Sequence, residues 1–195
     1  MSELFPKKNE VLAFKTDTVW GFGARVDDKI AINKIYEIKK RDLKKPLILM
    51  SNDFSHLEKY IQNVPKYAYE LIEKYLPGAL TLIFEKSPLC PGYITSYNST
   101  VGVRIPDGID FTNIIDKTDC KVLATTSCNV SNETPVKSYL EALEKFSNCA
   151  TVIEPMSDKE TDNIPSTVIL CKQNGYQILR SGAILVSINS SKEIF

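Results

Sequence analysis

The sequence lacks the features of several large protein classes. It has no run of about 18 apolar residues, and the first fifteen residues contain no apolar stretch of signal-peptide length. Lys+Arg and Asp+Glu both number 24, so the net charge is zero. This argues against a protein that binds duplex nucleic acid through a large excess of positive charge. We therefore expect a cytoplasmic protein that makes no contact with a membrane.

The sequence also has a single histidine, no closely spaced cysteine pair and no known phosphate-binding loop motif. Five cysteines lie far apart with no C-x-x-C pair, which predicts reduced thiols rather than a disulfide framework or a zinc site. His56 is the only histidine, and hydrolytic triads need an oriented imidazole beside the nucleophile. Gly21-x-Gly23 lacks the third glycine of a dinucleotide fingerprint, and no G-x-x-x-x-G-K-[ST] segment occurs. A bound nucleotide must therefore be held without a Walker loop.

The remaining pattern is that of one α/β domain. A chain of 195 residues with 43% hydrophobic residues can bury a core without disulfides. Several strands follow one another without room for a crossover helix, so we expect a mixed sheet with helices packed on it rather than a regular βαβ repeat. The spacing of apolar residues predicts strands at 11–14, 46–50, 79–85, 101–105, 121–125, 151–154, 167–171 and 176–179. It predicts helices from about 28 to 38 and at 54–61, 65–76, 111–116 and 136–146.

A basic run follows the first predicted helix. Residues 39–45, KKRDLKK, hold five cations in seven positions. Arginine offers a planar fork of donors and lysine a compact charge, which together suit a polyphosphate. The alternative is a solvated helix end, where cations meet the negative end of the helix dipole. The run by itself leaves both interpretations open.

Short polar side chains collect where predicted strands end. Thr16-Asp17-Thr18 comes directly after the first strand, Ser127-Cys128-Asn129 follows the strand at 121–125, and Ser166 precedes another. Such groups suit small polar ligands, although they are also ordinary turn residues. Arg104 lies inside an apolar strand, where a charge is costly unless an anion pairs with it, either a ligand or a structural partner such as Asp17.

Seven short segments follow one another along the chain and span about residues 11 to 185. The segments are KTDTVWGFG from Lys15 to Gly23, KKRDLKKPL from Lys39 to Leu47, LPGALT from Leu76 to Thr81, VRIP from Val103 to Pro106, SCN from Ser127 to Asn129, PSTV from Pro165 to Val168 and ILRSG from Ile178 to Gly182. In their order and spacing they resemble the YrdC/Sua5 family, the threonylcarbamoyl-AMP synthases of tRNA modification.

The resemblance implies a fold, a reaction and a set of partners. The fold is a twisted mixed sheet with flanking helices around an open, positively lined cavity, in the short, single-domain form over residues 1–195. The reaction joins L-threonine, bicarbonate or CO2 and ATP into threonylcarbamoyl-AMP and pyrophosphate, with Mg2+ accompanying ATP and no metal held by protein side chains. tRNA or proteins that complete the tRNA modification are further possible partners.

The resemblance also implies roles for individual residues. Lys39 and Arg41 are expected to be catalytic and to hold the triphosphate. The other ATP-binding residues are Ser127, Asn129 and Arg180, and the threonine-binding residues are Thr16, Thr18, Arg104 and Ser166.

The sequence departs from the family pattern at Lys15, Trp20, Asp42, Ala79 and Cys128. Lys15 adds a cation where the family has proline, and Asp42 is placed to pair with Arg41 and draw it away from phosphate. Two alternatives to the synthase are a non-catalytic RNA-binding or ribosome-associated module and a domain that processes carbamoyl-adenylate. The polar stretch at 158–163 is expected to form a loop over the cavity.

Overall fold

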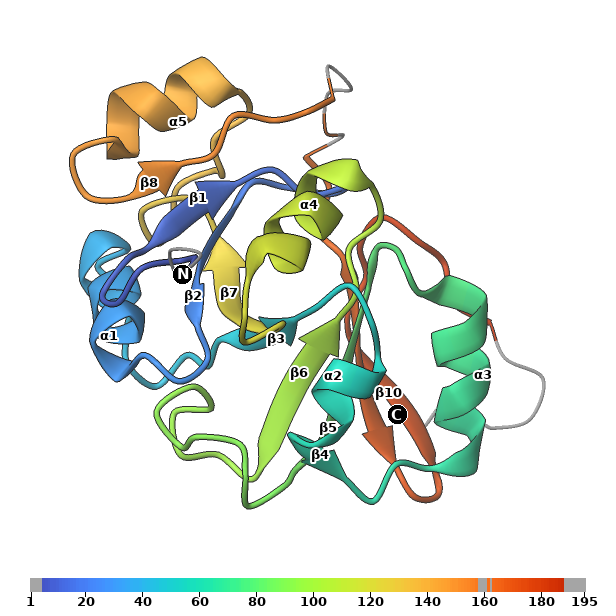
Figure 1. Ribbon diagram of the computed structural model, residues 1–195. Helices are drawn as coiled ribbons and strands as arrows, with labels where there is room; N and C mark the ends of the chain where they lie inside the picture. The colour runs from blue at the N-terminus through green and yellow to red at the C-terminus, as the bar shows by residue number, and fades with distance from the viewer. Residues whose placement is uncertain (1–4, 158–160, 162, 188–195) are drawn as a thin grey trace.

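A computed structural model describes residues 5–157, 161 and 163–187 of the chain (Figure 1). Within these residues, ten strands form one sheet of order β10-β9-β5-β6-β3-β7-β2-β1-β8, with β4 paired to β5. The pairs β1–β8, β3–β6 and β5–β9 are parallel and the others antiparallel, so the predicted mixed sheet is confirmed. The strands are β1 Leu12–Phe14, β2 Gly21–Arg25, β3 Ile48–Met50, β4 Ile61–Gln62, β5 Leu80–Lys86, β6 Thr100–Arg104, β7 Leu123–Ser127, β8 Thr151–Val152, β9 Thr167–Lys172 and β10 Gly175–Arg180.

Within the described residues, five helices flank this sheet. They are α1 Lys29–Ile38, α2 Ser55–Glu58, α3 Lys66–Tyr75, α4 Ile109–Lys117 and α5 Tyr139–Phe146. α1 begins where predicted, because the Asp28 carboxylate accepts the amide of Ala31 and so caps the first turn. None of the helices in the described ranges is long and apolar enough to cross a membrane.

The two faces of the central strands differ in how far they are covered. One face packs into the main apolar core together with α1, α3 and α5, and its strand residues include Phe22, Leu49, Leu82, Val103, Ala124 and Ile169. The alternate residues of the same strands point to the other face, because side chains alternate along a strand. There α4 covers one end, where Phe111 packs against Phe14 and Leu123. The rest of that face is left open and forms a cavity.

Two strands differ from the sequence-based expectation. Gly21–Arg25, where the sequence analysis predicts no strand, forms β2 in the interior of the sheet between β1 and β7. Its glycines are required by packing, since a Cβ on Gly23 would lie 2.7 Å from the ring of Phe14. The predicted helix at 54–61 ends at Glu58, and Ile61–Gln62 pairs with β5 instead.

Lys15 and Asp110 form an ion pair that joins the end of β1 to the first turn of α4. The two side chains are 9% and 12% exposed, with Nζ 3.2 Å from Oδ2. Lys15 also donates to the carbonyl and hydroxyl oxygens of Ser157, at 2.7 and 2.9 Å. The cation that departs from the family pattern therefore has a structural partner. Most of the predicted loop at 158–163 lies outside the described residues.

Candidate functional site

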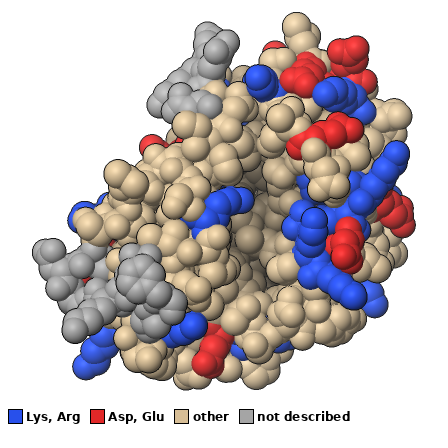
Figure 2. Space-filling view, turned by 180° about the vertical axis from the view of Figure 1, so that it is seen from behind, with Lys and Arg blue, Asp and Glu red and all other residues tan. Residues whose placement is uncertain are grey.

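The open face of the sheet encloses a cavity of about 260 Å3, and it brings together six of the nine predicted site residues. Thr16, Arg41, Arg104, Ser127, Ser166 and Arg180 all line it. Figure 2 shows this side of the molecule hollowed, with lysine and arginine side chains on both walls of the hollow. Seven sequence motifs spread over the chain therefore converge on one place.

The cavity has a one-sided charge. Three arginines line it, and none of its lining residues is an aspartate or glutamate. Burial lowers the pKa of Arg41, Arg104 and Arg180 below the usual arginine value, because each guanidinium has lost part of its water. Arg180 lowers the pKa of Arg104 further through charge repulsion. Such a site is suited to a ligand with several negative charges.

Arg104 is held at the end of β6 by three neighbours. Its Nε donates to the Gly78 carbonyl at 3.0 Å, Nη1 to the Thr18 hydroxyl at 2.7 Å and Nη2 to the Asp17 carboxylate at 2.5 Å. The structural pairing with Asp17 is thus present. A guanidinium has five N–H groups, so two remain for a ligand, one on each terminal nitrogen. Two N–H groups side by side match the fork of a carboxylate.

The C-terminal turn of α1 places Lys39 and Arg41. Arg41 donates its amide to the carbonyl of Tyr36 and Lys40 donates to Glu37, which is the Schellman pattern, with Lys40 at φ 47°. This turn sends Arg41 to the cavity wall, where its guanidinium donates to the carbonyls of Lys45 and Pro46 at 3.2 and 3.0 Å.

Asp42 does not pair with Arg41, contrary to the sequence-based expectation. Its carboxylate accepts the amide of Lys44 at 2.9 Å within the same turn. Because Arg41 binds carbonyl groups of the loop instead, its positive charge is left uncompensated by Asp42.

Lys39 lies behind the cavity wall rather than on it. The residue is 1% exposed, and its ammonium donates to the carbonyl oxygens of Ser127 and Asn129, at 2.5 and 2.8 Å, and to Asn129 Oδ1 at 3.0 Å. All three N–H groups are therefore used. Burial, together with repulsion by Arg41, lowers the pKa of Lys39 to about 8. Lys39 thus contacts two other predicted site residues, while direct contact with phosphate stays a prediction.

Asn129 and Thr18 also support the wall without lining it. Asn129 Oδ1 accepts the Ser127 hydroxyl at 2.6 Å, and its amide group donates to two carbonyls of the following turn. Thr18 contacts Arg104 and lies 3.2 Å from the Thr16 hydroxyl. Ser127 is the last residue of β7 rather than a residue beyond the strand, because β7 covers Leu123–Ser127 and is shifted by two positions from the predicted strand at 121–125.

Several lining residues were not predicted as site residues. Thr81 of β5 and Thr125 and Thr126 of β7 add hydroxyl groups, and Met50, Ile83 and Val168 add apolar surface. The sequence signal was present for two of them, because Thr81 ends the LPGALT segment and Thr125 ends a predicted strand. Nothing local shows that they share one wall, since Thr81 and Thr125 lie on strands separated by β6 and β3.

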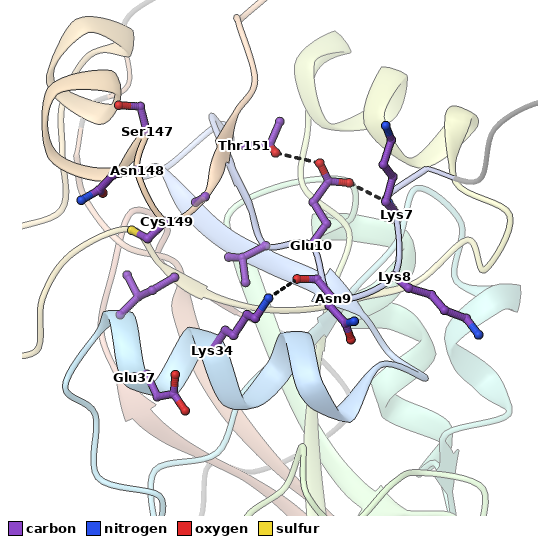
Figure 3. A pocket seen from close by; sticks show the side chains of 13 residues that line it. Lys7, Lys8, Asn9, Glu10, Lys34, Glu37, Ser147, Asn148, Cys149 and Thr151 are labelled. Atoms are coloured by element: carbon purple, nitrogen blue, oxygen red, sulfur yellow. Dashed lines mark hydrogen bonds between the residues drawn. The ribbon is translucent and has the colours of Figure 1, made fainter.

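A second, wider hollow of about 670 Å3 contains none of the predicted residues. It lies between residues 7–11, α1 and the turn before β8 (Figure 3). Its polar groups largely satisfy one another: Lys34 donates to the Asn9 carbonyl, and Glu10 accepts both the Thr151 hydroxyl and the Lys7 amide. Both lysines and glutamates line it, so it lacks the one-sided charge of the sheet cavity. We therefore take the smaller cavity as the candidate site.

His56 is not part of this site. It lies on α2, half-buried, with Nδ1 3.0 Å from the Ser51 hydroxyl. Among the residues that the structure describes, no cluster of three histidine, cysteine, aspartate or glutamate side chains could hold a metal ion.

Comparison with known proteins gives consistent results. A family model named Sua5_yciO_yrdC, with the description "Telomere recombination", matches residues 5–182. A Bacillus subtilis protein named threonylcarbamoyl-AMP synthase is 34% identical over 91% of this chain and 51% of its own length. A relative from Methanocaldococcus jannaschii is 34% identical over 78% of this chain and 80% of its own length.

Solved structures agree with the fold. The structure of Pyrococcus abyssi Sua5 complexed with L-threonine is 31% identical, with a TM-score of 0.82, over 89% of this chain and 51% of that one. The chain spans about half the length of its relatives from P. abyssi and B. subtilis. Since the family model covers nearly all of the described residues and the sheet matches that of Sua5, the chain belongs to the Sua5/YciO/YrdC family.

Proposed function

We propose that this protein is a threonylcarbamoyl-AMP synthase, a nucleotidyltransferase that uses L-threonine, bicarbonate or CO2 and ATP. The observation that carries the proposal is the cavity itself, where three arginines and no carboxylate form the wall at motif positions of the family. The names of the relatives and the L-threonine complex of the P. abyssi structure support the same assignment. The product would serve the N6-threonylcarbamoyladenosine modification of tRNA.

The reaction needs positioning and charge neutralisation rather than a covalent protein intermediate. The threonine amine attacks CO2, an N–C bond forms and a proton is released, which gives a carbamate. A carbamate oxygen then attacks the α-phosphorus of ATP, the bond from that phosphorus to the bridging oxygen breaks, and pyrophosphate leaves. The main contribution of a protein to such a step is positive charge placed beside the transferred adenylyl group and the departing pyrophosphate.

Each arginine has unused donors for one part of this chemistry. The two free N–H groups of Arg104 suit the threonine carboxylate, beside the hydroxyl of Thr16. Arg180 donates through Nε and Nη2 to Ser166, so both N–H groups of Nη1 are available to phosphate oxygens. Nη1 of Arg41 has no hydrogen bond within the described residues and serves the same purpose.

Lys39 supports the nucleotide side of the cavity from behind. Its three hydrogen bonds fix the backbone and side chain of the Ser127–Asn129 turn, which leaves the Ser127 hydroxyl at the wall. Mg2+ enters with the triphosphate as the substrate salt, and because the cavity wall has no carboxylate, we assign no protein ligand to it.

Pyrophosphate release from Mg-ATP tests the proposal. Threonine and bicarbonate are each omitted in turn, with serine as a control for the side chain. We expect release only when both small substrates are present, and Arg180→Met to lower kcat/KM by about a hundredfold. Arg25→Met is a matched control, since Arg25 pairs with Asp27 outside the cavity.

Release without dependence on threonine would contradict the proposed synthase. If the folded protein released no pyrophosphate but bound RNA with an affinity that fell steeply as salt rose, the non-catalytic RNA-binding alternative would replace it.

A further inference from the structure

Thr81 is a buried cavity residue to which neither the motifs nor the proposed reaction assign a role. It lies on β5, opposite Val168 of the parallel strand β9, and is 2% exposed. Its Oγ1 lies 2.8 Å from Oγ of Ser166, which is 4% exposed and immediately precedes β9. Arg180, the last residue of β10, approaches the same serine from the other side.

The hydrogen bonds at Ser166 determine where its proton points. Arg180 Nη2 donates to Ser166 Oγ at 3.2 Å, and this uses one of the two lone pairs of that oxygen. Thr81 Oγ1 has no other hydrogen-bond partner within the described residues, and at 2.8 Å either hydroxyl can be the donor of the bond between them. When Thr81 donates, its proton fills the second lone pair of Ser166. The Ser166 proton is then left to point into the cavity that the serine lines.

We propose that Thr81 is a positioning residue that makes Ser166 a fixed hydrogen-bond donor to an anionic oxygen of the amino-acid substrate. The inference rests on the proposed function. A serine hydroxyl is ordinarily free to donate or accept, but here Thr81 and Arg180 occupy its acceptor positions. The ligand group must then be an acceptor, and the amino-acid substrate offers two such anions: the carboxylate and the carbamate formed on its amine. An ammonium group, which can only donate hydrogen bonds, is not favoured there.

Thr81→Val tests this role because valine keeps the shape and removes only the hydroxyl. We expect the KM of threonine or of bicarbonate to rise about fivefold, with the KM of ATP changed less than twofold. Thr81→Ser restores the hydroxyl and is expected to behave like the wild type. Thr81→Ala is a second hydroxyl-free variant should valine disturb the fold, which thermal unfolding of each variant monitors.

Two binding experiments distinguish the carboxylate from the carbamate. Calorimetric binding of threonine alone involves only the carboxylate, whereas binding with bicarbonate and a non-hydrolysable ATP analogue includes the carbamate. If Thr81→Val weakens binding in the first experiment, Ser166 donates to the carboxylate. If the variant weakens binding only in the second experiment, Ser166 donates to the carbamate.

A double variant shows whether Thr81 acts through Ser166. In a Ser166→Ala background, Thr81→Val should produce no further change in threonine or bicarbonate KM, because the hydroxyl it positions is gone. Independent, additive effects, or an equal rise in the KM of ATP, would overturn the proposal. Wild-type protein that neither releases pyrophosphate with threonine nor binds threonine would instead refute the proposed function, and this inference with it.

Discussion

Replacing Arg104 by methionine separates its contact with the turn after β1 from the substrate binding that we propose for it. The side chain is 3% exposed and pairs with Asp17, whose side chain is 19% exposed. Methionine fills most of the same volume, so the change removes the charge and its hydrogen bonds without opening a large cavity.

The expected loss of stability follows from what is left unpaired. Breaking a buried ion pair by removing one partner costs about 3–5 kcal/mol, since the other charge stays without a partner. Asp17 keeps partial access to water, so we expect the lower end, about 3 kcal/mol of unfolding free energy. For a chain of this length that corresponds to a fall in Tm of about 6–12 °C, and the variant should still fold.

Urea denaturation and threonine calorimetry, applied to three variants, test both the contact and the substrate binding. Arg104→Met should lose stability and threonine binding. The double variant Arg104→Met/Asp17→Asn should regain at least half of the lost stability, because no unpaired carboxylate remains, but should not regain threonine binding. Asp17→Asn alone is the matched single variant.

Two results would refute this reasoning. A double variant no more stable than Arg104→Met would mean that the unpaired Asp17 is not the source of the loss. Normal threonine binding by Arg104→Met would mean that the carboxylate site lies elsewhere in the cavity.

Two further predictions follow from the walls of the cavity. The pKa of Lys39 is lowered to about 8. As pH rises through 8, its ammonium therefore loses one of the three N–H groups that hold the Ser127–Asn129 turn. We expect ATP affinity to fall by up to about tenfold per pH unit above 8. Calorimetry from pH 7 to 9.5 measures this, with Lys40→Asn as the exposed neighbouring control, and a constant affinity up to pH 9.5 would contradict it. Gly182→Ala should lower the free energy of unfolding, measured in urea, by about 1–3 kcal/mol and weaken threonine binding, because the alanine Cβ would lie 2.2 Å from the Pro165 carbonyl oxygen beside Ser166. Equal losses in the adjacent surface variant Ser181→Ala would show that the close approach at Gly182 is not the cause.

Local patterns in the sequence were enough to predict most of the sheet. Alternation predicted strands at 101–105 and 176–179, where the structure has β6 Thr100–Arg104 and β10 Gly175–Arg180. The start of α1 was likewise readable, because a cap such as that of Asp28 depends on residues within one turn.

Strands whose formation depends on distant partners were not predictable in this way. β2 contains glycines that local propensity assigns to turns, yet it is an interior strand because Phe14 needs the space above those glycines. β4, of two residues, exists only through its pairing with β5. In both cases tertiary packing outweighs the weak local preference.

For the site, the sequence by itself determined most of the residues that meet. The resemblance carried by the motifs named six residues that line the cavity, Arg41, Ser166 and Arg180 among them. It also named Lys39, Asn129 and Thr18, which do not line it, and it missed Thr81 and Thr125, which do. Only the tertiary structure decided what each group faces. Lys39 and Arg41 are neighbours in one basic run, but one ammonium is used entirely by acceptors about ninety residues away, while the guanidinium next to it reaches the cavity. Hydrogen-bond partners so distant in sequence are chosen by the packing of the sheet, which no local pattern encodes.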